Sequence, residues 1–94
     1  MLYTFSQAHY SEQELTTWLE QVNQQDAVVL WQDGVLLALK YPHLWQQAHC
    51  YALQQDVTAR NLGELYAKNA PKVRCISLED FISLTEQFFP QLAL

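Results

Sequence analysis

Hydrophobic residues in this chain form short continuous runs, separated by longer stretches in which they recur with a helical period. Short apolar runs of this kind are typical of strands that are buried on both faces. They predict strands at residues 2–5, 27–31, 49–53 and 72–76. The closing residues 91–94, QLAL, fit either a fifth short strand or a segment that contacts a partner.

The clearest helix signal lies in residues 11–22, SEQELTTWLEQV. Ser11 and Glu14 have the spacing of a capping box, in which each side chain accepts a hydrogen bond from the other residue's backbone N–H. The apolar residues that follow recur at helical spacing, which places them on one face of a helix. These residues are Leu15, Trp18, Leu19 and Val22.

Residues 77–89, SLEDFISLTEQFF, predict a second long helix, with Ser77 as the N-cap and Pro90 ending it. Strands that alternate with helices need crossover connections, and these give a mostly parallel sheet with helices on both faces. We therefore expect a single three-layer α/β domain over residues 1–94, with a sheet of four to five strands.

An Asp-Gly pair follows the second predicted strand and fits a hairpin turn, a strand-to-helix corner or an anion cradle. The next run, VLLALKY, lacks strand alternation and is rich in Leu and Ala, which favours a helix. We expect Asp33 to be its N-cap and Gly34 to let the backbone turn sharply. Asp56 repeats the pattern before residues 57–62. Because helix N-termini at a sheet edge can bind anions, Asp33, Gly34 and Asp56 are candidate ligand-binding residues. The negative charges of Asp33 and Asp56 would, however, repel a phosphate.

Two cysteines are candidates for sulfur chemistry, because a thiolate is a strong nucleophile. Cys50 lies within a predicted strand and is expected to be a buried, inert thiol. Cys75 lies near the end of its strand, beside Arg74 and before Ser77, so it is the better candidate catalytic residue of the two, although structural burial is the favoured interpretation and no catalytic residue is assigned. The spacing of cysteines and histidines indicates no metal site, and no glycine-rich loop indicates a cofactor.

Composition adds an expectation about partners. Half of the residues are hydrophobic and only 16% are charged, so we expect an apolar patch to stay exposed for another chain. Trp45, which follows a helix-ending Pro42, is either an interface anchor or a core residue. The net charge of −5 argues against direct nucleic-acid binding. With no leader and no apolar run of about 20 residues, the chain is expected to be cytoplasmic, without a membrane span.

Three blocks in a fixed order, VVLWQDGVLLAL, YALQQDVTARNL and ISLEDFISLTEQFFPQLAL, resemble the DsrH/TusB family of small sulfur-relay proteins. The resemblance covers nearly the whole chain and implies a DsrE-like fold of the flavodoxin/Rossmann-like type. It also implies a noncatalytic subunit of a TusBCD-type heterohexamer, with two copies each of this chain and of TusC-like and TusD-like paralogues. Such a complex passes persulfide sulfur toward 2-thiolation of wobble uridine (mnm5s2U34) in tRNA, and its sulfur-carrying cysteine lies on the TusD-like subunit.

Two alternatives remain open beside this interpretation. In one, the chain is itself a persulfide-carrying sulfurtransferase that acts through Cys75. In the other, it is a DsrEFH-type subunit of sulfur oxidation. Some DsrH relatives from sulfur oxidisers have a cysteine in the first helix, and the corresponding position in this chain is Trp18. The resemblance therefore favours the tRNA branch, whereas composition alone indicates only a cytosolic α/β interaction domain.

Overall fold

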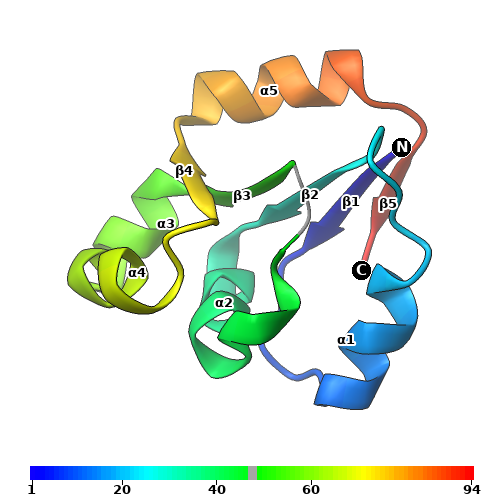
Figure 1. The fold of residues 1–94 in the computed structure, drawn as a ribbon. Coiled ribbons are helices and arrows are strands. Elements are labelled where there is room, and N and C mark those ends of the chain that lie inside the picture. The colour runs from blue at the N-terminus through cyan, green and yellow to red at the C-terminus, as the bar shows by residue number, and fades with distance from the viewer. Residues whose placement is uncertain (47–48) are drawn as a thin grey trace.

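Five parallel strands form one sheet in the computed structural model, which describes residues 1–46 and 49–94 (Figure 1). Every neighbouring pair of strands is parallel, and the spatial order is β4-β3-β2-β1-β5. The sheet confirms the predicted α/β class, and the closing segment forms a strand. The strands are β1 (Leu2–Phe5), β2 (Ala27–Leu30), β3 (Cys50–Leu53), β4 (Arg74–Ile76) and β5 (Gln91–Ala93).

The helices cover the two faces of the sheet unequally (Figure 1). The first three crossovers step across the sheet in one direction, so right-handed connections place their helices on the same face. The last connection returns from β4 to β5, which places α5 on the opposite face. The helical elements are α1 (Glu12–Leu19), the 3₁₀ helix η1 (Gln32–Leu36), α2 (Leu37–Lys40), the 3₁₀ helix η2 (Pro42–Leu44), α3 (Gln54–Ala59), α4 (Gly63–Asn69) and α5 (Leu78–Gln87).

Local capping explains where the two longest helices begin. The Ser11 hydroxyl accepts from the backbone N–H of Glu14 at 3.1 Å, and the Glu14 carboxylate accepts from that of Ser11 at 3.0 Å. This confirms the capping box. At α5, the Ser77 hydroxyl accepts from the backbone N–H of Asp80 at 3.1 Å, as its position predicts.

Two predicted helices differ from the structure in their extent. The α1 helix ends at Leu19 rather than at residue 22, because the backbone N–H groups of Gln21 and Val22 bond carbonyls three residues back and so tighten the turn. The predicted helix after the Asp-Gly pair is a 3₁₀ turn followed by the single turn α2. None of the described helices is both long enough and apolar enough to cross a membrane.

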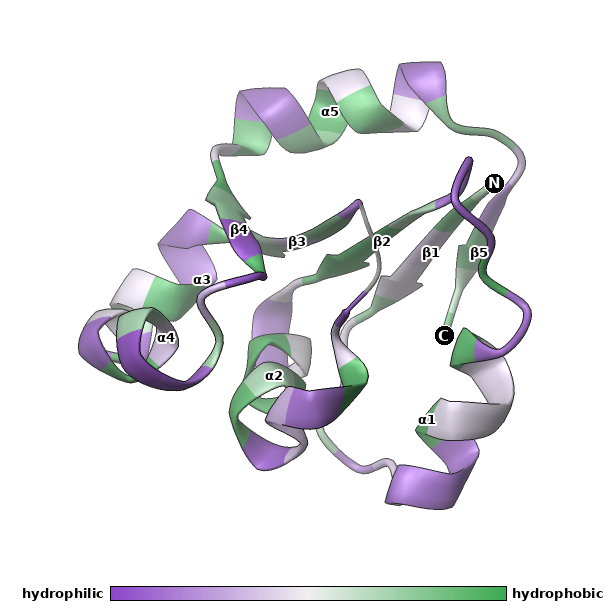
Figure 2. Ribbon diagram, viewed as in Figure 1, coloured by the Kyte–Doolittle hydropathy of each residue, from purple (hydrophilic) through white to green (hydrophobic). Residues whose placement is uncertain are grey.

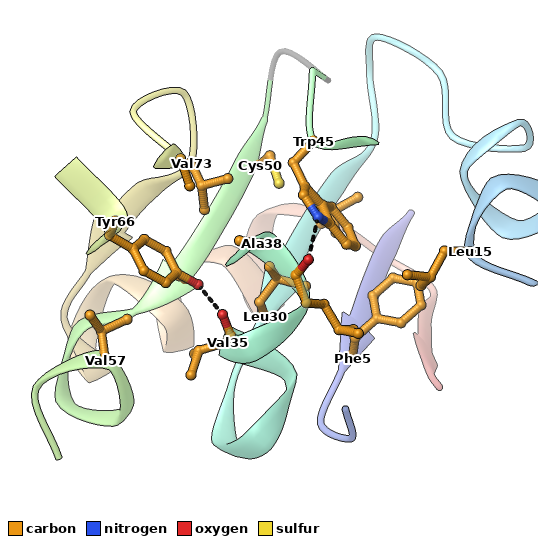
Figure 3. Close-up of a cluster of buried hydrophobic side chains, with 14 of the residues drawn as sticks. Phe5, Leu15, Leu30, Val35, Ala38, Trp45, Cys50, Val57, Tyr66 and Val73 are labelled. Carbon is orange, nitrogen blue, oxygen red and sulfur yellow. Dashed lines mark hydrogen bonds between the residues drawn. The ribbon is translucent and has the colours of Figure 1, made fainter. Parts of the chain in front are cut away.

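Two groups of buried side chains pack against opposite faces of the sheet. The larger group lies under α1 to α4 and includes Phe5, Leu30, Val35 and Tyr66 (Figure 3). The smaller group lies under α5 and consists of Leu2, Ala27, Val29, Ile76 and Leu84. Figure 2 shows hydrophobic residues concentrated along β2 and β3 and hydrophilic residues on the outer turns of the helices. The central strands are thus buried on both faces, as their continuous apolar runs predict.

The Asp-Gly pair forms a strand-to-helix corner, which excludes the hairpin. The expectation that Gly34 turns the backbone is corrected, because Gln32 is the residue with a positive φ of 52°. Gly34 is needed for a different reason. A Cβ at this position would lie 2.0 Å from the carbonyl oxygen of Phe5, at the end of β1. The absence of a side chain therefore lets η1 pack directly against the neighbouring strand.

We expect Gly34→Ala to destabilise the protein by about 2 kcal/mol or more, because backbone must move to accommodate the methyl group. Urea unfolding followed by circular dichroism measures this change. Gly63→Ala is the matched control, since a methyl group added there, at the start of α4, would meet no side chain or distant backbone within 4 Å. It should leave stability within about 1 kcal/mol of the wild type. Equal unfolding midpoints for the two variants would contradict the close approach at Gly34.

Candidate functional site

One arginine joins the loops that follow β2 and β3. Arg60, at the end of α3, donates to the Asp33 carboxylate at 2.7 Å and to the backbone carbonyl of Asp56 at 3.1 Å. The Asp56 carboxylate accepts from the backbone N–H of Gln32 at 2.7 Å. This contact satisfies the N–H group of Gln32, one of two residues with positive φ among those that the structure describes. The two corners thus form one network at the carboxyl edge of the sheet.

Neither Asp33 nor Asp56 has the predicted capping role. The N-cap positions of η1 and α3 are occupied by Trp31 and Leu53, whose side chains make no capping bond. Asp56 bonds across to the neighbouring loop, and the exposed Asp33 pairs with Arg60. The anion-binding hypothesis for Asp33, Gly34 and Asp56 gains no support from this arrangement, because the nearby guanidinium and the Gln32 N–H already have carboxylate partners.

Sequence reasoning missed Arg60 as the centre of this network. One signal was present, since Asp56 and Arg60 are four residues apart on a helix and can pair. Their closest charged atoms lie 3.6 Å apart. A shorter contact, at 2.7 Å, joins Arg60 to Asp33, which is 27 positions away. Local spacing does not reveal such a contact.

Cys50 is buried against the larger hydrophobic cluster, at the start of β3 (Figure 3). Its exposed fraction is 2%, and burial raises the pKa of its thiol to about 12. A thiol in such surroundings stays protonated at neutral pH. The expectation of a buried, unreactive cysteine therefore agrees with its environment.

Cys75 is partly buried on the edge strand β4, on the same face of the sheet as Cys50. It borders a cavity of about 260 Å³ that Val57, Tyr66 and Ala70 also line. Burial raises the pKa of the Cys75 thiol. Arg74 does not offset this effect, since strand alternation directs it to the α5 face, where it lines a separate groove with Asp80. Arg74 therefore does not supply Cys75 with the activating cation that their adjacency in the sequence suggests.

Trp45 lies in the core, which agrees with one of the two alternatives for this residue and contradicts the other, an exposed interface anchor. It is 1% exposed, and its indole N–H donates to the backbone carbonyl of Leu37 at 3.0 Å (Figure 3). Its ring meets that of Phe5 edge-on, with centroids 5.9 Å apart. The indole thus fills the space between η2 and β1 and stabilises the short helices around it.

Exposed apolar side chains do occur on this chain, at positions other than Trp45. Leu78 and Ile82 on α5 are 48% and 52% exposed, and Phe89, just beyond the helix, is 72% exposed. Leu65 on α4 is 47% exposed and lies on the other side of the sheet. The sequence predicted an exposed patch from composition but did not locate it. Its largest members gather along α5.

Fold and side-chain environment together define a class of protein. It is a small parallel α/β domain in which burial opposes ionisation of both thiols and apolar side chains are exposed along one helix. Among the described residues, no three His, Cys, Asp or Glu side chains are grouped so as to hold a metal ion.

Comparison with known proteins supplies the family. Residues 7–91 match the family model described as DsrH like protein. The chain therefore belongs to the DsrH family. It is 47% identical over 96 residues to an uncharacterized protein of Haemophilus influenzae, with complete coverage of both chains. It is 36% identical over 98 residues to Protein TusB of Pectobacterium parmentieri and to Protein TusB of Yersinia pestis, with 99% of each chain covered.

The network around Arg60 leads to a stability prediction. Asp56→Ala removes the acceptor for the Gln32 N–H and should lower the free energy of unfolding by about 1–3 kcal/mol, as expected for a bond to a charged group. Asp33→Ala is the control, because its ion pair is more exposed and should contribute at most about 1 kcal/mol. Thermal unfolding of both variants measures the difference. A larger loss of unfolding free energy for Asp33→Ala than for Asp56→Ala would show that the bond between the Gln32 N–H and Asp56 is not the main stabilising contact of this network.

The thiol environments lead to a prediction about pH. A raised pKa leaves less thiolate at neutral pH, so iodoacetamide should modify Cys75 more slowly than it modifies glutathione. The rate of Cys75 modification should keep rising between about pH 7 and pH 10, since the Cys75 thiol ionises above neutral pH. Cys50 should react only after unfolding. Mass spectrometry of the two cysteine peptides measures both rates, and faster reaction of Cys75 than of glutathione at pH 7 would contradict its assigned environment.

Proposed function

We propose that this protein is a noncatalytic subunit of a cytoplasmic, TusBCD-type sulfur-relay complex that acts toward 2-thiolation of wobble uridine in tRNA. Membership of the DsrH family implies a subunit of a sulfur-relay complex. The observation that supports the finer assignment is full-length similarity, at 36% identity, to proteins named Protein TusB. The partners in this proposal are TusC-like and TusD-like paralogues, with two copies of each subunit in a heterohexamer.

The thiol environments support a noncatalytic role. A sulfur relay needs a thiolate that attacks the terminal sulfur of a donor persulfide. The donor S–S bond breaks, the donor leaves as a thiolate, and the attacking thiol becomes the persulfide. Cys50 is too buried for such an attack, and burial also raises the pKa of Cys75. We therefore assign the transferring cysteine to a partner subunit. The net charge of −5 similarly favours an indirect link to tRNA over direct contact.

Two alternatives have less support. A persulfide carrier acting through Cys75 would use a thiol that is partly exposed beside a cavity, but Arg74 lies on the opposite face of the sheet. A DsrEFH-type subunit of sulfur oxidation shares the family. The first-helix position at which some relatives have cysteine is occupied by Trp18, whose indole packs against the larger core cluster.

Assembly and activity test the proposal together. Native mass spectrometry should show a mixed complex when the protein is co-expressed with its TusC-like and TusD-like paralogues. Cells lacking the protein should lose 2-thiouridine from tRNA. The double variant Cys50→Ala, Cys75→Ser should restore the modification as well as the wild type does, because neither thiol transfers sulfur.

Each result has a distinct meaning. A chain that remains monomeric beside both paralogues would overturn the proposed function. A double-cysteine variant that assembles normally but does not restore thiolation would instead identify this chain as a sulfur carrier. Restoring Cys75 alone in that variant would then show whether Cys75 is the residue responsible.

A further inference from the structure

One face of the sheet has a layer of helices that is only partly complete. Five strands spaced by about 4.8 Å extend over roughly 19 Å between the outer strand axes, whereas a helix with its side chains is about 10 Å wide. Among the elements of residues 1–46 and 49–94, four α-helices and two 3₁₀ helices cover one face, and α5 alone covers the other (Figure 1). On β5, Gln91 and Ala93 are exposed. The α5 face therefore has room for additional protein beside the helix.

The sides of α5 differ in their environment. Phe81, Leu84 and Phe88 pack onto the sheet. Asp80 and Gln87 border the groove of about 220 Å³ next to β4. At 3.6 residues per turn, positions 78 and 82 fall on the remaining side, which is turned away from β4.

Leu78, Ile82 and Phe89 form what we call the α5 patch, and each is about half exposed or more. Leu78 and Ile82 lie one turn apart at the start of α5, and Phe89 lies just beyond the end of the helix, so large apolar side chains are exposed near both of its ends. Clustered exposed apolar side chains of this kind mark surfaces that contact other proteins. The isolated Leu65 on α4 lacks such neighbours among the large exposed hydrophobic residues.

Charge around the α5 patch distinguishes between possible occupants. Glu79 and Glu86 lie on the helix beside the patch, and α5 contains no lysine or arginine. Asp80 and Arg74 instead line the groove next to β4, on the side of the helix away from the patch. A two-fold dimer of this chain through α5 would place the same acidic side chains of both copies close together. Like charges at an interface oppose association, whereas basic groups on a different chain would complement these carboxylates. The charges therefore favour a partner other than a second copy.

We propose that the α5 patch docks a different protein chain, which presents apolar side chains bordered by lysine or arginine. This inference rests on the proposed function, because it assigns α5 as the surface that meets a paralogous subunit. The partner would extend the helical layer across the β1 and β5 side of the sheet. Burial of the patch would supply affinity, and the acidic border would select the partner.

Paired variants test the apolar part of this surface. The double variant Leu78→Ser, Ile82→Ser should weaken binding to the paralogues by about tenfold or more, as expected when central apolar contacts are lost. Leu65→Ser is the matched control, since it removes an equally exposed leucine from the other face. It should leave the affinity unchanged. Circular dichroism of the isolated chains should show the same helix content for all variants, which separates loss of binding from unfolding.

A charge variant tests the proposed chemistry of the partner. Glu86→Lys places a cation in the acidic border and should lower the affinity, and the affinity of the wild type should fall with added salt. Glu20→Lys is the control, because Glu20 is an exposed residue at the end of α1 on the other face. It should bind as the wild type does. Analytical ultracentrifugation of the purified mixtures measures all of these affinities.

The outcomes separate this inference from the proposed function. A wild-type chain that binds neither paralogue overturns both proposals. Normal assembly by the wild type and by the Leu78→Ser, Ile82→Ser and Glu86→Lys variants overturns only the docking surface. A homodimer of the wild type that is lost in the α5 variants overturns the different-chain partner and identifies a second copy as the occupant.

Discussion

The right-handed crossover is the constraint on which the arrangement of this molecule depends. Three successive connections step from β1 to β4 in one direction and therefore place α1 to α4 on one face. The return to β5 is the only described connection that crosses to the other face. The larger core, both cysteines and the indole of Trp45 consequently lie under the crowded layer. The sparse layer contains α5 and most of the large exposed apolar side chains.

The two faces of the sheet also separate a cation from a thiol that are adjacent in the sequence. Arg74 and Cys75 are neighbours in the chain, yet alternation along β4 sends them to opposite faces. The cation therefore faces α5, while the thiol faces the core and has a raised pKa. A subunit built in this way supplies surface to a complex more readily than it supplies a nucleophile.

Local signals predicted the strands and the two capped helices well, because these depend on neighbouring residues. The Ser11 and Ser77 caps are examples, since each bonds a residue three positions away. The site was less predictable. The Asp33–Arg60 bond and the core position of Trp45 depend on contacts between distant segments, and no spacing rule describes them. The steric need for Gly34 also arises from a different strand.

The two edges of the sheet limit how this protein can associate. Its edge strands, β4 and β5, are three residues long, whereas the interior strands have four. A short edge offers few unpaired backbone groups, and Arg74 places a charge on one of them, so continuation of the sheet into another molecule is disfavoured. Extended strand-to-strand aggregation is disfavoured for the same reason. In a chain half composed of hydrophobic residues, the short edges thus leave contacts between side chains, and not strand pairing, as the favoured means of association.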